Sequence, residues 1–182
     1  MITPKQLETK RLILRRYIRD DFDAFLNLMR IEQVTRHLNF TQEEKTFEGI
    51  RNLFCGVINS YNNRDSIFAL AIFHKNTGEY IGSCGLNTLN NNDRVECFYA
   101  LLPQYWGNGF AIEAMKKLLE YAFSLKEITK VVAFINPKNS RSWKVAERIG
   151  MKYLGHVPYE NITIKPMYFS IEKTEHQNQS SS

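Results

Sequence analysis

The sequence predicts a mixed α/β (α+β) domain with a mostly antiparallel central sheet. In the first half, strand-like stretches at 66–73 and 79–88 are joined by Lys75-Asn76-Thr77-Gly78, a typical hairpin turn. In the second half, a strand at 94–102 leads into a glycine turn and an amphipathic helix, an order that requires a parallel crossover. The 182 residues suffice for one core, so we expect a single domain over residues 1–172.

The first expected strand covers residues 10–17. Arg11 and Arg15 share one of its faces with Ile13, because side chains alternate along a strand. A net charge of +5 permits a nucleic-acid contact, but the basic residues are scattered along the chain. We therefore expect a solvated strand edge here and no direct nucleic-acid partner.

Two helices are expected next. Asp20 or Asp21 can cap the first, which places on one face Phe22, Phe25, Leu26 and Met29. Thr41 and Glu44 form a capping box ahead of the second. The apolar stripe of this second helix is most simply core, and it consists of Phe47, Ile50, Phe54, Val57, Ile58 and Tyr61.

The segment from Gln104 to Ala111 carries the most functional information. Gly107 and Gly109 allow a tight turn with uncovered N–H groups, and the following helix adds free N–H groups and the positive end of its dipole. Such an arrangement binds phosphate or pyrophosphate, although an ordinary turn with a glycine cap is the alternative. The P-loop Lys-Ser/Thr does not follow either glycine, and Ile112 replaces the third glycine of a dinucleotide fingerprint.

A second block repeats the order of strand, turn and helix. Residues 131–135 are rich in β-branched and aromatic side chains, as in a buried strand. A polar turn at 136–142 precedes a helix that stops at Gly150. Closing strands are expected at 152–157 and 165–172.

These blocks resemble the GNAT N-acetyltransferase superfamily over about residues 9–172. Q-x-x-G-x-G at Gln104–Gly109 is similar to its acetyl-CoA pyrophosphate loop. The ribosomal-protein N-terminal acetyltransferase branch carries an N-x-x-S…(Leu/Ile)-Gly-Phe segment, which is matched here by Asn139, Ser142, Ile149 and Gly150, with Met151 in place of Phe. The resemblance implies six to seven strands, about four flanking helices, and acetyl-CoA held in a splay between central strands.

The resemblance also implies which residues bind acetyl-CoA. The backbone of Tyr99, Ala100 and Leu101 would contact the pantetheine arm and the acetyl oxygen, and the loop would hold the pyrophosphate. The expected cofactor-binding residues are Tyr99, Ala100, Leu101, Gln104, Trp106, Gly107, Asn108, Gly109, Phe110, Ala111, Asn139 and Ser142.

Two residues are expected to be catalytic. Glu96 is the expected general base, because it lies among apolar residues where many relatives carry a carboxylate and burial would raise its pKa. A surface ion pair or simple positioning of the amine is the alternative, and Glu160 is a second candidate base. Many relatives protonate the thiolate with a Tyr where this chain has Ala146. The branch that this chain resembles offers the serine of N-x-x-S instead, so the resemblance implies Ser142 as the proton donor, although a helix cap would also explain this serine.

The predicted function is acetyl-CoA-dependent acetyl transfer to a primary amine. The expected acceptor is a protein N-terminal α-amine, and Phe47, Phe54 and Tyr61 would wall its groove. A polyamine or aminoglycoside acceptor is the first alternative. A non-catalytic CoA-binding module and a nucleotide-binding switch are the others.

Composition bounds the remaining properties. The three cysteines and four histidines lack metal-ligand spacing, so we expect no metal site and mostly buried, reduced thiols at Cys55, Cys84 and Cys97. No apolar run or N-terminal signal region indicates a membrane or exported protein, so a cytoplasmic location is expected, with a homodimer left open. The polar residues 173–182 are expected to form a frayed tail.

Overall fold

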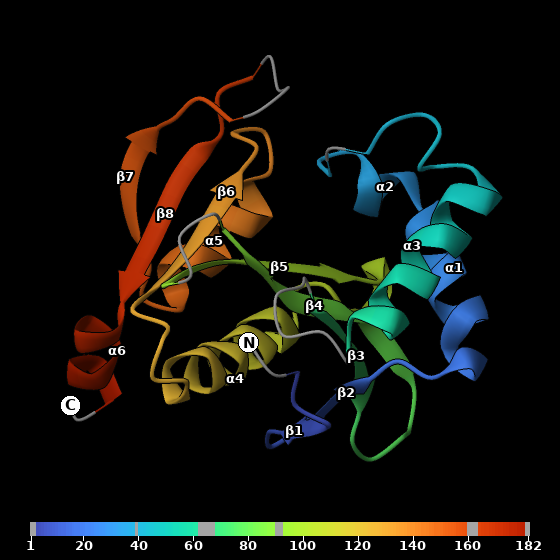
Figure 1. Ribbon diagram of the computed structural model, residues 1–182, viewed down its shortest axis with the longest axis horizontal. Helices are drawn as coiled ribbons and strands as arrows, with labels where there is room; N and C mark the ends of the chain where they lie inside the picture. The colour runs from blue at the N-terminus through green and yellow to red at the C-terminus, as the bar shows by residue number, and fades with distance from the viewer. Residues whose placement is uncertain (1–2, 39, 62–67, 90–92, 160–163, 181–182) are drawn as a thin grey trace.

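The computed structural model describes residues 3–38, 40–61, 68–89, 93–159 and 164–180 (Figure 1). The strands are β1 (Gln6–Glu8), β2 (Leu12–Arg16), β3 (Phe68–His74), β4 (Tyr80–Thr88), β5 (Arg94–Leu101), β6 (Lys130–Ile135), β7 (Lys152–His156) and β8 (Met167–Glu172). The α-helices are α1 (Phe22–Arg30), α2 (Glu32–Thr35), α3 (Phe47–Ser60), α4 (Phe110–Ser124), α5 (Ser140–Arg148) and α6 (Lys173–Ser180).

The strands form one sheet in the order β1-β2-β3-β4-β5-β6-β8-β7. Every pairing is antiparallel except that of β5 with β6, which α4 connects. The mostly antiparallel sheet with one parallel crossover is therefore confirmed. Within the described residues, the sheet has eight strands instead of six to seven, because Gln6–Glu8 also pairs with β2.

Strands β5 and β6 separate soon after they pair. Their register covers Arg94 with Lys130, Val95 with Val131 and Glu96 with Val132. Beyond Glu96, β5 continues to Leu101 against β4, while β6 continues to Ile135 against β8. Figure 1 shows the two strands diverging, with the rest of the molecule on either side of the opening.

Helices cover both faces of the sheet, and β3 shows why. Its large side chains Phe68, Leu70 and Ile72 belong to the core that contains α4 residues. The intervening Ala69 and Ala71 belong to the second core, which contains α1 and α3 residues. Because side chains alternate along a strand, the two residue sets point to opposite faces.

The N-terminal arginines are not at a solvated strand edge, and that expectation is wrong. Strand β2 lies between β1 and β3. The Arg15 guanidinium pairs with Asp21 at 2.7 Å and lies 4.2 Å from the ring centroid of Phe73. Asp21 also accepts from the Ile18 N–H, so its carboxylate is engaged there and makes no capping hydrogen bond to α1.

The expected capping box forms, but it closes a turn rather than a helix. The Thr41 N–H donates to Glu44 Oε2 at 2.7 Å, and the Glu44 N–H donates to Thr41 Oγ1 at 3.2 Å. Helix α3 starts later, at Phe47, where Thr46 Oγ1 accepts from the Gly49 N–H at 3.1 Å. Thr46 is thus the N-cap of α3.

The C-terminal segment is also more ordered than expected. Residues Lys173–Ser180 form α6, so a frayed tail is wrong for them. Lys173 Nζ donates to the Leu125 carbonyl at 3.0 Å, Glu175 pairs with Lys152, and the His176 ring lies 5.1 Å from that of Phe123. These contacts are with distant segments, so the polar composition of the tail did not reveal them.

Candidate active site

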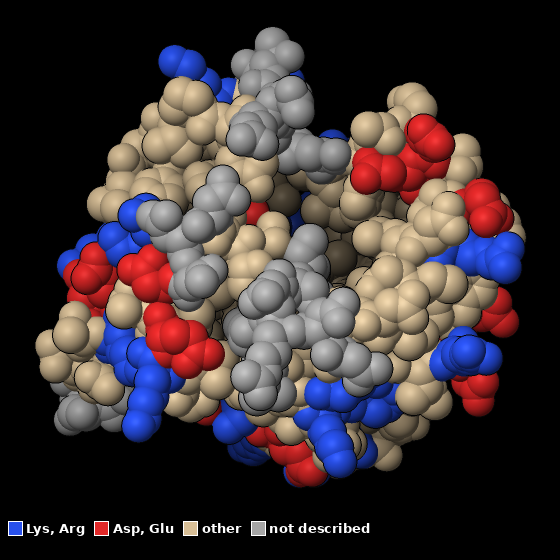
Figure 2. Space-filling model, in the orientation of Figure 1, with Lys and Arg blue, Asp and Glu red and all other residues tan. Residues whose placement is uncertain are grey.

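A cavity of about 840 Å³, here called the central cavity, opens where β5 and β6 separate. Its lining includes consecutive residues of both strands, Glu96–Leu101 on β5 and Ala133–Asn136 at the end of β6. The glycine turn, the start of α4 and one side of α5 line one part of it, and α1 to α3 line another. Figure 2 shows the molecule hollowed between these two halves.

The glycine turn has the conformation that the sequence predicts. Gly107 and Gly109 have φ values of +80° and +78°, a left-handed region that favours glycine. Gly109 is the N-cap of α4, so the first N–H groups of the helix lack intrahelical acceptors. Trp106 Nε1 donates to the Leu101 carbonyl at 2.8 Å, which joins the turn to the end of β5.

The structure brings most of the expected cofactor-binding residues together. All of them line the central cavity except Gln104 and Asn108. Gln104 lies exposed on the short turn Pro103–Tyr105. The Asn108 side chain is turned toward the Trp106 carbonyl, to which Nδ2 donates at 3.3 Å.

Glu96 lies where the strands part, with its carboxylate largely buried. Tyr159 donates to Glu96 Oε2 at 3.1 Å, and the Tyr159 ring lies 4.5 Å from that of Phe134. Burial raises the pKa of Glu96, although hydrogen bonds from Tyr159 and Asn87 act in the opposite direction. Among the described residues no Lys or Arg forms an ion pair with Glu96, so the structure does not support the surface-pair alternative.

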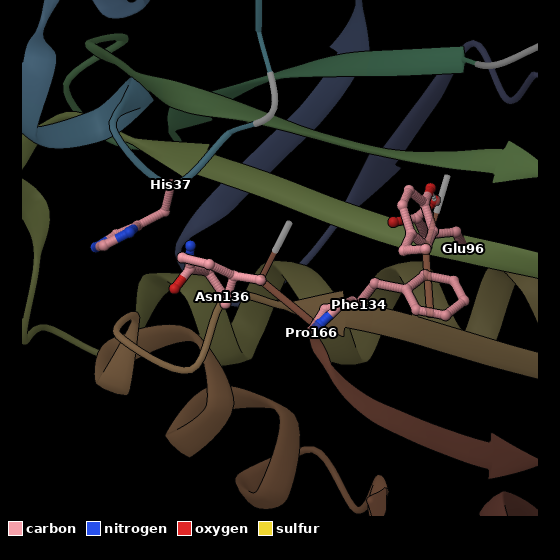
Figure 3. Close-up of a pocket in the computed structure, with 7 residues that line it drawn as sticks. His37, Glu96, Phe134, Asn136 and Pro166 are labelled. Carbon is pink, nitrogen blue, oxygen red and sulfur yellow. Dashed lines mark hydrogen bonds between the residues drawn. The ribbon is translucent and has the colours of Figure 1, made fainter. Parts of the chain in front are cut away.

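A pocket of about 30 Å³ adjoins the central cavity beside Glu96 (Figure 3). It is large enough for a water molecule. His37, from the turn after α2, lies on its other side. Burial, with smaller effects of Arg36 and Lys138, lowers the pKa of His37, which favours the neutral form of this imidazole. The other candidate base, Glu160, lies outside the described residues.

Ser142 faces the central cavity together with Tyr99. Asn139 Oδ1 accepts from the Ser142 N–H at 3.3 Å and caps α5, so the cap is Asn139 and not Ser142. The Tyr99 hydroxyl donates to Ser142 Oγ at 3.3 Å. Burial raises the pKa of Tyr99 to about 12, so the phenol keeps its proton at neutral pH. Ala146 is buried on α5, one turn beyond Ser142.

Sequence reasoning used only the backbone of Tyr99 and missed its side chain. The signal was present in the alternation of β5. Cys97, Tyr99 and Leu101 point to the α4 face, whereas Glu96 and Phe98 point to the α1 and α3 face. Tyr159 and His37 were also missed, because they reach the site through turns that the sequence pattern does not place.

The wall expected for the acceptor groove is wrong. None of Phe47, Phe54 and Tyr61 is among the described residues that line the central cavity. Phe54 packs against Tyr17 and Phe25, the Tyr61 hydroxyl donates to the Ala69 carbonyl at 2.6 Å, and Phe47 is 48% exposed. The apolar lining on this side instead includes Phe25, Met29, Val34, Leu38, Phe40, Leu53, Val57, Ala69 and Phe98.

The thiols carry no catalytic signal. Cys84 and Cys97 are buried and Cys55 is exposed, and all three are free. Cys97 lines the central cavity, but burial raises its pKa to about 12, which keeps it a protonated thiol. Within the described ranges, no group of three or more His, Cys, Asp or Glu side chains is arranged to hold a metal ion, and no helix is long and apolar enough to cross a membrane.

The family model described as the Acetyltransferase (GNAT) domain matches residues 11–152. The chain belongs to this family. It is 31% identical over 153 residues to the Uncharacterized N-acetyltransferase p20 of Bacillus licheniformis, a match that covers 82% of this chain and 83% of that protein. A shorter match, 37% over 76 residues, covers 39% of this chain and 42% of the Putative ribosomal N-acetyltransferase YdaF of Bacillus subtilis (strain 168).

A solved structure agrees with this assignment at the level of fold. The spermidine N-acetyltransferase from Vibrio cholerae, solved in complex with CoA and spermine, superimposes with a TM-score of 0.77 at 19% identity. The match covers 93% of this chain and 100% of that one. The predicted fold class and the predicted N-acetyltransferase activity, with acetyl-CoA as the acetyl donor, are confirmed at the level of the family.

Proposed function

We propose that this N-acetyltransferase acetylates the α-amine of a protein or peptide N-terminus, as the ribosomal-protein branch of the family does. One observation carries the proposal. A carboxylate with a raised pKa, Glu96, lies at the parting of β5 and β6 beside a wall of apolar side chains that also carries Arg36 and Glu44. Such a group can accept one proton from one amine.

The proposed position of acetyl-CoA follows from free backbone N–H groups. The start of α4 and the turn at Gly107 and Gly109 offer N–H groups and a positive helix end to the pyrophosphate. Between Cys97 and Leu101 the β6 side of β5 has no paired strand in the described register, so this edge can hydrogen-bond the pantetheine arm. Both groups line the central cavity, and the thioester would then lie close to Glu96.

Glu96 is assigned the role of general base. An α-ammonium has a reference pKa of about 8, so it must lose a proton before its nitrogen can attack the acetyl carbonyl. The burial that raises the pKa of Glu96 makes this carboxylate a better proton acceptor than an exposed glutamate. The proton reaches Glu96 directly, or through a water in the adjoining pocket of about 30 Å³.

Ser142 and Tyr99 are assigned to the departing thiolate. Because Tyr99 donates its proton to Ser142 Oγ, the serine O–H cannot be directed back to that phenol. The serine hydroxyl is thus free to donate into the cavity that both residues line. Tyr99 positions Ser142, and Ser142 would hydrogen-bond the sulfur as negative charge develops there.

Charge distribution favours a single amine over a polycation. The described lining of the central cavity contains two carboxylates, Glu44 and Glu96. Its basic residues are Arg36, Arg141, Lys144 and Arg148. A polyamine or aminoglycoside would gain little electrostatic attraction from this set, whereas one α-amine followed by apolar side chains suits Glu96 and the apolar wall.

A peptide with a free N-terminus and an internal lysine tests the choice of acceptor. We expect acetylation at the α-amine first, because at pH 7 that amine is neutral roughly 200 times more often than a lysine side chain. Tandem mass spectrometry locates the acetyl group, and spermidine added at equal concentration serves as a competitor. Acetylation only of lysine, or only of spermidine, would exclude the proposed acceptor while leaving the family assignment intact.

A further inference from the structure

Arg11 joins the N-terminal segment to the glycine turn, 97 residues later in the chain. Its Nη1 donates to the Asn108 carbonyl at 3.0 Å, and its guanidinium lies 4.5 Å from the ring centroid of Phe110. A Cβ built on Gly109 would lie 3.5 Å from Arg11 Nη2, so the guanidinium packs directly against this glycine.

The same arginine is fixed by Glu113 in the first turn of α4. Arg11 Nε donates to Glu113 Oε2 at 2.6 Å, and the Arg11 backbone N–H donates to Oε1 at 2.8 Å. Thr9 Oγ1 adds a third hydrogen bond to Oε1 at 2.6 Å. Although burial acts to raise it, these hydrogen bonds leave the pKa of Glu113 lowered, so the carboxylate stays ionised.

We propose that Arg11 positions the turn between Gly107 and Gly109 for the pyrophosphate of acetyl-CoA. The Asn108 carbonyl and the Gly109 N–H belong to one peptide unit, which is planar and trans. When Arg11 holds the carbonyl on its own side, the N–H points to the opposite side. One side-chain hydrogen bond thereby sets the direction of a backbone donor in a segment whose two glycines would otherwise leave it many conformations.

Arg11 also balances a charge that opposes diphosphate binding. A carboxylate in the first turn suits the dipole of α4, but it would repel an anion bound at the same helix end. Pairing with Arg11 at 2.6 Å neutralises Glu113 in place. Arg11 therefore acts through the turn and through Glu113, and this role rests on the pyrophosphate position proposed above.

The kinetic signature should be specific for acetyl-CoA. Arg11→Gln should raise the KM for acetyl-CoA, and the Kd of CoA measured by calorimetry, by about 10- to 100-fold, the range expected for charged hydrogen bonds. The kcat and the KM for the acceptor should change less than threefold. Acetyl-pantetheine lacks the pyrophosphate, so wild type and Arg11→Gln should turn it over at equal rates. Arg11→Lys, which keeps the charge but not the forked geometry, should recover only part of the affinity.

Arg15, four residues further along the chain, supplies a matched control. It also pairs with a carboxylate, Asp21 at 2.7 Å, and covers an aromatic ring, but it does not contact the turn. Arg15→Gln should leave the KM for acetyl-CoA unchanged. In an Arg11→Gln/Glu113→Gln double variant, removal of the unpaired carboxylate should restore part of the affinity that Arg11→Gln loses.

The outcomes distinguish an error in the role of Arg11 from an error in the proposed pyrophosphate position. An Arg11→Gln enzyme with unchanged affinity for CoA, or with equal losses for acetyl-CoA and acetyl-pantetheine, overturns the role of Arg11. If Gly109→Val also leaves CoA affinity unchanged while the protein stays folded, the pyrophosphate position itself is wrong. If Arg11→Gln does not fold, Arg11→Lys carries the same comparison between the two thioesters.

Discussion

Replacing Glu96 by Gln should slow acetyl transfer by about 100- to 10,000-fold at pH 7, the usual contribution of a general base. The amide keeps the shape of the side chain and can still accept from Tyr159, which donates to Glu96 at 3.1 Å. It cannot take up a proton. CoA affinity should stay within about threefold of wild type, because Glu96 lies on the opposite face of β5 from Tyr99 and the start of α4.

The pH dependence gives the prediction its magnitude. With a reference pKa of about 8, an α-amine is neutral in about one-tenth of the molecules at pH 7 and in about nine-tenths at pH 9. The variant depends on amine that arrives neutral, so its rate should rise about tenfold over this interval. Wild-type activity should instead fall at acid pH, as Glu96 is protonated around its raised pKa, and change little above neutrality.

Initial rates from pH 5 to 9.5, at saturating acetyl-CoA, measure both profiles. Glu44→Gln is the matched control, because Glu44 is the other carboxylate in the described lining of the central cavity and its side chain is exposed. It should keep wild-type turnover. Parallel pH profiles for wild type and Glu96→Gln, or a loss below tenfold, would assign Glu96 to positioning the amine and refute the general-base argument.

Three further predictions test the site. Gly109→Val should abolish the rise in melting temperature that saturating acetyl-CoA gives the wild type, because φ of +78° strains a β-branched residue; a normal rise would mean that the turn does not bind pyrophosphate. Tyr99→Phe should lower kcat less than Ser142→Ala does, and the double variant should be no slower than Ser142→Ala. Additive losses of the two single variants in single-turnover experiments would show that Tyr99 does not act through Ser142. Glu96→Gln should raise the melting temperature at pH 7 but not at pH 4. The pKa of Glu96 is higher in the folded state, so its stabilising contribution is complete below the pKa of the unfolded state and is lost as pH rises through the pKa of the folded state. A rise in melting temperature that does not depend on pH would contradict the raised pKa of Glu96.

The sequence pattern was sufficient to predict the turns and the strand alternation, which depend on neighbouring residues. The hairpin turn ends at Gly78, whose φ is +71°, and the second turn has its positive φ values at Gly107 and Gly109. The alternation of β3 between large residues and alanines is likewise visible in the sequence, and it assigns the two faces of the sheet. In each case the constraint lies within a few residues, either as a backbone conformation or as a period of two.

Most of the candidate cofactor site was also predictable, because glycine turns and strand ends have local signatures. The acceptor side was not. Phe54 and Tyr61 sit on the helical stripe that faces inward, but the strands beneath α3 decide that they meet Tyr17 and Ala69 rather than the central cavity. Helical periodicity separates buried from exposed positions, and it does not say which buried surface borders a cavity.

The sequence by itself therefore determined the class of the domain, the glycine turn with its free N–H groups, and Glu96 as the carboxylate of the strand that feeds it. The tertiary structure alone decided three pairs: Arg11 with Glu113, Tyr99 with Ser142, and Tyr159 with Glu96. Their members are 102, 43 and 63 residues apart. No local sequence pattern predicts a side-chain contact over such a separation, because the packing of strands and helices brings the two residues together only when the sheet is complete.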